Sequence, residues 1–515
     1  MVATAVGHRA VAGLMLLGLD VGITGTRALA IDESGTVRAS AFVGYGIHRP
    51  RPGWTEQDPL EWWAAAQEAL ARVAGEVGGV GLVGGEVTAI GLSGQMSGSV
   101  FLNAAGEVIR PALLWNDQRT GPQCAEITER VGAERLIELT GNPAWTAMQA
   151  PKILWLRDVE PVQYRHVRRV LLPKDYIRLR LTGELATDVA DASGSLLLDS
   201  RRRAWSAEVL DALGIPAAWL PSVSESCVIA GGLRPSVAAS LGLPAGLPVA
   251  AGAGDAAAAA IATGIVRSGL ISAAIGSCGM LVAHRDGFGV DGSGRVGAMC
   301  SAVPGRYLVV SLTLAAGAAW RWWRDLLGGD VDYERLGRLA ESSAVGARGL
   351  FFLPYLNGGW PPHDPDGVGR GAFVGLGAHH DQGDLTRAVM EGVVFSLRDG
   401  LDAMREMGVA IERVRVSGGG ARSHVWRQML ADVFGLPVET MASEEGPAVG
   451  AALVAGVAVG EYRAVTEACD RTVRTGEVIE PDAGRAARYG ELLHRFRALV
   501  RATQGVASPG RTRGG

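Results

Sequence analysis

The feature that most constrains this chain is a hairpin that carries an aspartate beside a glycine turn. Residues 16–19 are apolar and lead to Asp20, residues 21–25 supply two glycines and a threonine, and residues 26–31 return as a second apolar strand. A carboxylate beside exposed turn amides can hold a hydrated metal ion and contact phosphate oxygens. A plain hairpin in which the aspartate caps the turn explains this motif equally well when it is read alone.

A related pattern returns near the middle of the chain. Residues 247–251 form a short apolar run that leads through small residues to Asp255, and residues 270–275 lead into the turn at 276–279. We therefore expect two similar halves that divide just before the first of these runs. Asp255 has no salt-bridge partner nearby in the sequence, which suits a general base, although a strand-end cap is a comparable interpretation. The turn at 276–279, read alone, is most simply a structural turn.

A third glycine cluster, at 418–420, follows an apolar strand that is predicted over 414–417. A helix is predicted over 424–434, with Ser423 as its N-cap. Three successive glycines allow a planar base or a phosphate to approach the backbone closely, although they could also form only a tight turn. A further helix is predicted to begin at Pro59 with Asp58 as its N-cap.

Composition excludes several classes of protein. The formal net charge of −4 over 515 residues gives no basic surface for nucleic acid or for anionic lipid. The chain has no apolar run long enough for a membrane helix. Its five cysteines include no Cys-x-x-Cys pair, which favours a reducing compartment over a disulfide framework or a zinc site. We expect a cytoplasmic protein, with Met15 as an alternative start.

Short motifs in a fixed order connect these features over most of the chain. They are Trp54-Thr55-Glu56-Gln57-Asp58-Pro59, Gly94-Gln95-Met96, Leu114-Trp115-Asn116-Asp117, Leu172-Pro173-Lys174-Asp175-Tyr176, Phe352-Leu353-Pro354-Tyr355-Leu356, Gly418-Gly419-Gly420-Ala421-Arg422-Ser423, Gly446-Pro447-Ala448 and a longer signature over 371–391. In these motifs the chain resembles the FGGY carbohydrate kinases, and within that family it is most similar to the xylulokinases. The resemblance extends from residue 16 to residue 499.

This resemblance implies an α/β fold of two ribonuclease-H-like domains, of the actin and sugar-kinase superfamily, with a cleft between them. The implied domains are 14–246, on the sugar and phosphate side, and 247–503, which carries the catalytic aspartate and the adenosine side. The segments 1–13 and 504–515 are expected to be disordered. The family also implies ATP and Mg²⁺ as cofactors, a small sugar as substrate and a homodimer.

The same resemblance assigns roles to individual residues. It implies that Asp255 is the catalytic base and that Asp20 belongs to the metal and ATP site. The residues expected to face the phosphates are Thr24, Gly276 and Ser277, and those expected to line the adenosine pocket are Gly419, Gly420 and Ala421. The residues expected in the sugar-facing wall are Gln95, Met96, Ser97, Trp115, Asn116 and Asp117.

The chain departs from the family pattern at four places. Ser97 and Ala256 stand where the family usually carries His and Asn, Cys278 replaces a hydroxyl residue in the phosphate turn, and 359–362 replaces a Glu-Arg-Thr-Pro segment. The resemblance indicates ATP-dependent phosphorylation of a pentulose, with D-xylulose and its 5-phosphate as first candidates. A kinase for another ketose, polyol or sugar acid stays open, as does a catalytically weak regulator that binds sugar or nucleotide.

Overall fold

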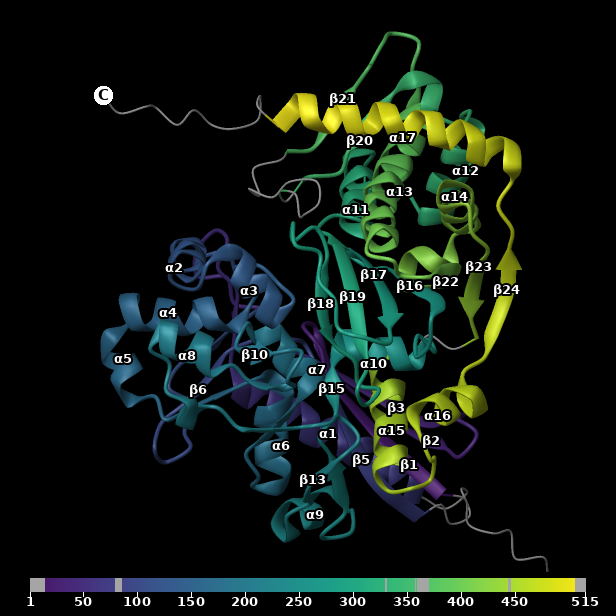
Figure 1. Cartoon of the computed structure of the whole chain (residues 1–515). Coiled ribbons are helices and arrows are strands. Elements are labelled where there is room, and N and C mark those ends of the chain that lie inside the picture. Colours follow the sequence, from purple (N-terminus) through teal and green to yellow (C-terminus); the bar gives the residue numbers. More distant parts are fainter. Residues whose placement is uncertain are drawn as a thin grey trace, which may run out of the picture.

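The protein consists of two lobes, each built around a seven-stranded mixed sheet (Figure 1). The computed structural model describes residues 14–78, 86–328, 331–356, 358, 370–442 and 446–504. The predicted extension 1–13, the departure at 359–362 and the tail beyond Gln504 lie outside the described residues.

The first sheet has β1 near its centre, paired antiparallel with β2 on one side and parallel with β5 on the other. Its strand order is β13-β14-β5-β1-β2-β3, and β15 also pairs with β5. The bounds are β1 (Leu14–Val21), β2 (Gly25–Asp32), β3 (Val37–Gly44), β5 (Glu86–Gly94), β13 (Ile229–Gly232), β14 (Pro248–Ala250) and β15 (Ala253–Gly254).

The second sheet repeats this connectivity. β16 pairs antiparallel with β17 and parallel with β22, and β23 adds to β22 as β14 adds to β5. The order is β18-β19-β17-β16-β22-β23-β24. The bounds are β16 (Gly269–Ile275), β17 (Gly279–Arg285), β18 (Gly297–Cys300), β19 (Tyr307–Thr313), β22 (Ile411–Ser417), β23 (Val438–Met441) and β24 (Thr475–Ile479).

The predicted repeat is therefore present, but its second copy begins at β16 and not at residue 247. The apolar run at 247–251 forms β14, which hydrogen-bonds to β5 of the first sheet, and β15 does the same. The first sheet thus extends beyond the predicted division at residue 246. A pairing between strands that lie about 160 residues apart has no local sequence signal.

Helices cover both faces of the first sheet. On one face α1 (Pro59–Gly78) buries Trp62, Leu70 and Val73, and it lies mainly over β2 and β3. Asp58 Oδ1 accepts a hydrogen bond from the Leu60 amide, as predicted for the N-cap. On the other face lies α15 (Gly446–Ala458). A Cβ on Gly18 would lie 1.9 Å from the Ala448 carbonyl oxygen, so this glycine lets α15 lie directly on the sheet.

One hydrophobic core joins the two lobes. It combines Leu16 and Ala89 of the first sheet with Val282 and Leu308 of the second, through residues of α10 (Asp255–Ala262) and α15. In Figure 1 these two helices lie between the sheets. Asp255 is the first residue of α10, so this shared core fixes the position of the helix that carries it.

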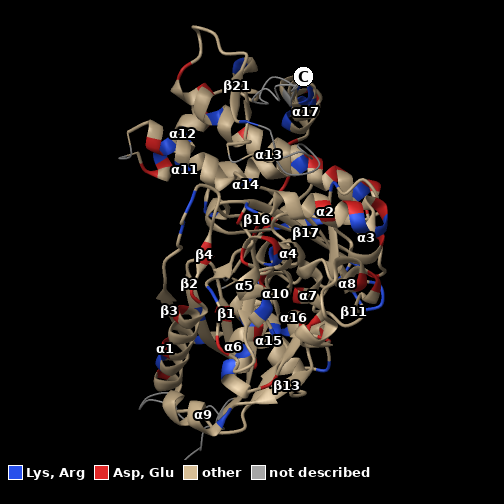
Figure 2. Ribbon diagram, turned by 90° about the vertical axis from the view of Figure 1, so that its left-hand side faces the viewer, with Lys and Arg blue, Asp and Glu red and all other residues tan. Residues whose placement is uncertain are grey.

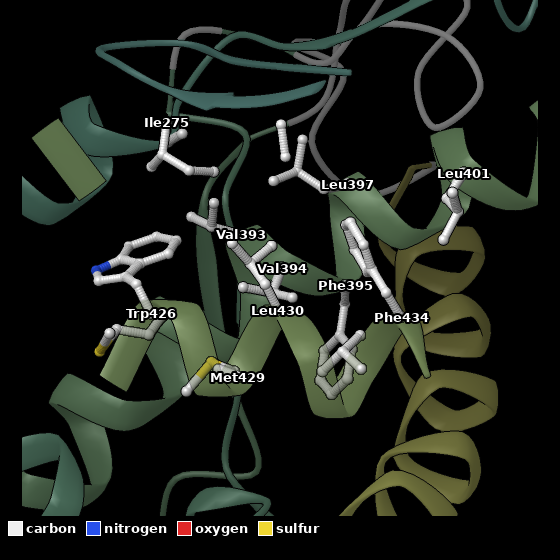
Figure 3. Close-up of a cluster of buried hydrophobic side chains, with 14 of the residues drawn as sticks. Ile275, Val393, Val394, Phe395, Leu397, Leu401, Trp426, Met429, Leu430 and Phe434 are labelled. Atoms are coloured by element: carbon white, nitrogen blue, oxygen red, sulfur yellow. The ribbon is translucent and has the colours of Figure 1, made fainter. Parts of the chain in front are cut away.

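The second sheet is covered by long helices with large apolar side chains. Figure 3 shows Trp426, Met429 and Leu430 of α14 packed against Val393 and other residues of α13. The helix predicted over 424–434 is confirmed, and Ser423 Oγ accepts from the Trp426 amide as its cap. The helices over this sheet are α11 (Gly317–Leu326), α12 (Tyr333–Ser342), α13 (Gln382–Glu406), α14 (His424–Phe434) and α17 (Ala483–Gln504). The helix α16 (Val465–Thr472) packs instead on α15 and α10, and its buried residues belong to the core shared by the two lobes.

A mostly helical insertion between β5 and β13 forms a separate apolar cluster beside the first sheet. Its helices are α2 (Gly121–Val131), α3 (Ala133–Thr140), α4 (Gln149–Val159), α5 (Pro161–His166), α6 (Pro173–Thr182), α7 (Val189–Ala192) and α8 (Ala207–Leu213), and α9 (Pro235–Leu241) follows β13. Short two-stranded pairs are formed by β4 (Glu56–Gln57), β6 (Val100–Leu102), β7 (Ala112–Leu113), β8 (Arg169–Leu171), β9 (Ala186–Asp188), β10 (Leu198–Asp199), β11 (Ala204–Trp205), β12 (Ser222–Ser224), β20 (Phe351–Leu353) and β21 (Ala372–Val374).

Charges of both signs are mixed on the outer helices. Figure 2 shows basic and acidic segments interspersed along α2 and α3, where Arg135 forms ion pairs with Glu138 and Glu208. Within the described ranges, no helix is both long and apolar enough to cross a membrane.

Candidate active site

Two aspartates lie at the same edge of the first sheet, on either side of β5. Asp20 on β1 is level with Ser93 of β5, and Ala253 on β15 is level with Ser93 from the opposite side. Asp255 follows β15 directly. The carboxyl ends of the parallel strands β1, β5 and β15 thus bring together two acids that are 235 positions apart in the sequence. The sequence motifs marked each acid as a candidate but did not place the two together.

Burial raises the pKa of both carboxyl groups. It raises the pKa of Asp20 to about 6, while the Ser93 hydroxyl and the Arg27 guanidinium act in the opposite direction. It raises the pKa of Asp255 to about 7, and the negative charge of Asp20 raises it further. The Ala256 amide donates to Asp255 Oδ1 over 2.7 Å and favours the charged form. Asp255 is therefore poised to accept a proton near neutral pH.

Side-chain hydrogen bonds fix the backbone of the turn after Asp20, while the tip of the turn is exposed. The Tyr45 hydroxyl donates to the Gly22 carbonyl over 2.6 Å, and Gln57 Nε2 donates to the Ile23 carbonyl over 2.7 Å. Thr24 at the tip is exposed. The backbone of the turn is thus fixed, while its hydroxyl is free to meet a ligand.

The segment after β5 lies between this turn and Asp255. Gln95 is buried and donates to the Gly22 carbonyl over 3.4 Å and to Gln57 Oε1 over 3.0 Å, so its amide nitrogen supports the turn. Met96 packs on Gly254, the residue before Asp255, where an added Cβ would lie 2.6 Å from Met96 Cγ. Ser97 is also buried, and its hydroxyl donates to the Gly194 carbonyl over 2.7 Å.

The Trp-Asn-Asp segment follows β7 and lies against Thr55. Asn116 Oδ1 accepts from the Thr55 hydroxyl over 2.7 Å. Asp117 is fully buried, pairs with Arg119 over 2.7 Å and accepts from the Thr55 amide over 2.7 Å. Trp115 and Asn116 are half-buried. Asp117 therefore fixes the segment and does not offer a free carboxylate, whereas Trp115 and Asn116 remain partly accessible.

A second group of predicted residues meets at the edge of the other sheet. β16 and β22 are parallel, so the turns at their carboxyl ends adjoin, and a Cβ on Gly418 would lie 2.8 Å from the Ile275 carbonyl oxygen. Gly276 and Ser277 are exposed. Gly419 is also exposed, and an added Cβ there would meet no atom within 4 Å. The open backbone at these two turns suits phosphate groups and a flat base.

The first group of residues fits a hard divalent cation. Asp20 Oδ1 is buried and accepts no hydrogen bond from the described residues. Nowhere in the described part of the chain do three or more His, Cys, Asp or Glu side chains gather as a metal site. A cation here would take one or two carboxylates and complete its shell with water and phosphate oxygens, as hard cations do at nucleotide sites.

The two duplicated sheets place the chain in the actin-like, two-domain class of folds. The chain belongs to the FGGY family of carbohydrate kinases: residues 15–262 match the N-terminal domain of that family and residues 276–459 match its C-terminal domain. It is thus a sugar kinase, a phosphotransferase that uses ATP, and such enzymes typically require a divalent metal ion.

Individual relatives show which sugar kinases this chain is similar to. The chain is 37% identical over 486 residues to the xylulose kinase of Escherichia coli (strain K12), covering 94% of this chain and 98% of that protein. A xyloylose kinase structure from Brucella ovis matches with a TM-score of 0.88 and 35% identity, over 96% of this chain and 100% of that one. A gluconate kinase structure from Lactobacillus acidophilus matches with a TM-score of 0.90 and 26% identity, over 96% and 99%.

Several residues that shape the site had no assigned role in the sequence. Gln57 and Tyr45 support the Asp20 turn, and Ser93 lies beside Asp20. Arg178 of α6 donates to the Ala251 carbonyl and so ties α6 to the strand that leads to Asp255. Gln57 stood within a recognised motif, which was the only available signal; the others depend on contacts between distant segments.

Proposed function

We propose that this protein phosphorylates D-xylulose on its O5 hydroxyl, with ATP and Mg²⁺, to give D-xylulose 5-phosphate. The observation that carries the proposal is the position of Asp255 beside Asp20, in surroundings that raise the pKa of Asp255 to about 7. The similarity to xylulose kinases over nearly the whole chain supports D-xylulose as the acceptor.

In this proposal Asp255 removes the proton from the attacking hydroxyl. A carboxylate whose pKa is close to the working pH combines a useful population of the basic form with a strong tendency to take the proton. Met96 and Ser97 form the wall beside Asp255, and Trp115 and Asn116 extend it. Gly419, Gly420 and Ala421 hold the adenosine, while Thr24, Gly276 and Ser277 contact the phosphates.

Mg²⁺ would be held by Asp20, directly or through water, and would neutralise charge on the transferred phosphoryl group. The unpartnered Asp20 Oδ1 supports this role. The protein's own contribution is to orient the acceptor hydroxyl and the nucleotide. A metal ion held here would also offset the repulsion between the carboxylates of Asp20 and Asp255.

A second acceptor class has one specific observation in its favour. A gluconate kinase, whose substrate is a sugar acid, is similar to this chain in fold over nearly its whole length. Ser97 directs its hydroxyl to Gly194, and Ala256 has no polar side chain, so neither residue offers a free donor to a sugar. A sugar acid or polyol is therefore the alternative acceptor.

We further propose that the protein is a homodimer of the cytoplasm. All five cysteines are free thiols, which suits a reducing compartment. The mass in solution, measured by light scattering, tests the dimer.

The decisive experiment measures ADP release with D-xylulose, other pentuloses, polyols and sugar acids, followed by phosphorus NMR of the product. We expect D-xylulose to have the highest kcat/KM and the phosphate to be on O5. A higher kcat/KM for gluconate or a polyol would overturn the D-xylulose assignment while leaving the kinase assignment intact.

A further inference from the structure

Ser97 has an unusual backbone conformation at the point where the proposed sugar wall turns. Its φ is +62°, in the left-handed region that residues other than glycine rarely adopt. The residue stands between Met96, which contacts Gly254, and Gly98. A strained residue of this kind persists only where the surrounding structure holds it.

Lys152 of α4 (Gln149–Val159) holds Ser97 in this conformation. Its side chain is fully buried, and its ammonium group donates to the Ser97 carbonyl over 2.9 Å, to the Met148 carbonyl over 3.0 Å and to the Ala147 carbonyl. Within the described ranges no carboxylate forms an ion pair with this ammonium group. Burial lowers the pKa of Lys152 to about 7, and in the charged form its three donors match the three carbonyl acceptors.

The same turn of α4 holds the next residue as well. Gln149 Nε2 donates to the Gly98 carbonyl over 3.2 Å and to the Leu171 carbonyl over 3.3 Å. On the far side, the Ser97 hydroxyl donates to the Gly194 carbonyl, and an added Cβ on Gly194 would lie 2.8 Å from Ser97 Oγ. Ser97 is thus fixed from two directions, with α4 on one side and the segment after α7 on the other.

We propose that Lys152 is a positioning residue for the sugar acceptor. It keeps Ser97 in the left-handed conformation and so holds Met96 against Gly254, which sets the width of the acceptor site next to Asp255. The proposal rests on the function proposed above, because it takes the segment 95–97 as the sugar wall. Lys152 itself touches no substrate, since its amine is fully buried and bonds to the three carbonyl groups.

The test is a double-mutant cycle between Lys152 and Ser97. Lys152→Met removes the three hydrogen bonds with little change in volume, and Ser97→Gly removes the penalty for a positive φ. We expect Lys152→Met to raise KM for the sugar about tenfold, a typical size for coupled neighbours, while KM for ATP stays within about twofold. In the Ser97→Gly background the same change should raise sugar KM by no more than about threefold.

Arg157→Met is the matched control, because Arg157 is another cation of α4 but pairs with Glu126 and Asp158 and not with the segment at 97–98. Its effect should be the same with and without Ser97→Gly. If Lys152→Met is too unstable to purify, Lys152→Gln retains two donors and should show a smaller effect of the same kind. Equal effects of a Lys152 change in both backgrounds, or an equal rise in KM for ATP, would overturn the proposal.

The cycle uses whichever acceptor the wild-type enzyme phosphorylates best. A wild-type preference for another acceptor would refute the D-xylulose assignment, and the cycle would still report on Lys152. Loss of coupling with D-xylulose as the preferred acceptor would refute only the role of Lys152.

Discussion

Replacing Asp20 by Asn should change the pH dependence of catalysis as well as its rate. The negative charge of Asp20 is one of the two causes that raise the pKa of Asp255, after burial. Asn keeps the shape of the side chain and removes the charge. The carboxylate form of Asp255 then becomes easier to reach, so its pKa falls and the acid limb of the activity profile moves to lower pH.

The size of this shift follows from the strand positions. Asp20 lies on β1 and Asp255 follows β15, with β5 between them, so their backbones are about 10 Å apart at ~4.8 Å per strand. At an effective dielectric constant of about 20 to 40, two charges at that separation interact by ~1–2 kcal/mol. That energy corresponds to a shift of about one pH unit.

The assay is the initial rate at low nucleotide concentration between pH 5 and 9, where kcat/KM reports the ionisation of the enzyme without bound ATP. Asp32→Asn is the control, because Asp32 is level with Met15 at the far end of β1, about 17 Å along the strand from Asp20. The acid limb should move for Asp20→Asn and stay in place for Asp32→Asn. An unchanged midpoint in Asp20→Asn would refute the electrostatic coupling of the two acids.

Two further predictions concern stability and nucleotide binding. Lys174→Met leaves the buried carboxylates of Asp175, Asp188 and Asp191 without the Lys174 ammonium group, so it should lower the free energy of unfolding, measured in urea, by ~3–5 kcal/mol. Asp191→Asn should cost much less, because burial raises the pKa of Asp191 and so favours its neutral form. Equal losses for the two variants would contradict this account. Gly419→Ala should raise KM for ATP about tenfold without lowering Tm, because an added Cβ there meets no protein atom within 4 Å. Gly420→Ala should lower Tm, because its Cβ would lie 2.3 Å from Ile275 Cγ2. A normal KM for ATP in Gly419→Ala would argue against the adenosine site.

The local elements of the fold could be predicted because their signals are local. The hairpin at 16–31, the helix that begins at Pro59 and the helix capped by Ser423 each combine an apolar pattern with turn or cap residues a few positions away. The partner of β14 could not be found in this way. Its apolar run resembles the start of a new half, and only its hydrogen bonds to β5 assign it to the first sheet.

The residues of the site likewise divide into those with a local sequence signal and those without one. Asp20 and Asp255 stand at strand ends beside small residues, so the sequence marks them as candidates. The burial of Asp117 by Arg119 and Thr55 has no such mark, because Thr55 is 62 residues away. The hydrogen bond from Lys152 to the Ser97 carbonyl joins residues 55 positions apart. Its importance depends on the positive φ of Ser97, which no sequence pattern reveals.

The most direct test of the account is the turnover of Asp255→Asn with the best acceptor of the wild-type enzyme, together with the Kd for ATP. If Asp255 accepts the proton of the attacking hydroxyl, kcat should fall by about 10²–10⁴-fold while ATP binds with unchanged affinity, because Asp255 is not among the residues proposed to contact ATP. A kcat within tenfold of wild type, at an unchanged Kd for ATP, would contradict the assignment of Asp255 as the catalytic base.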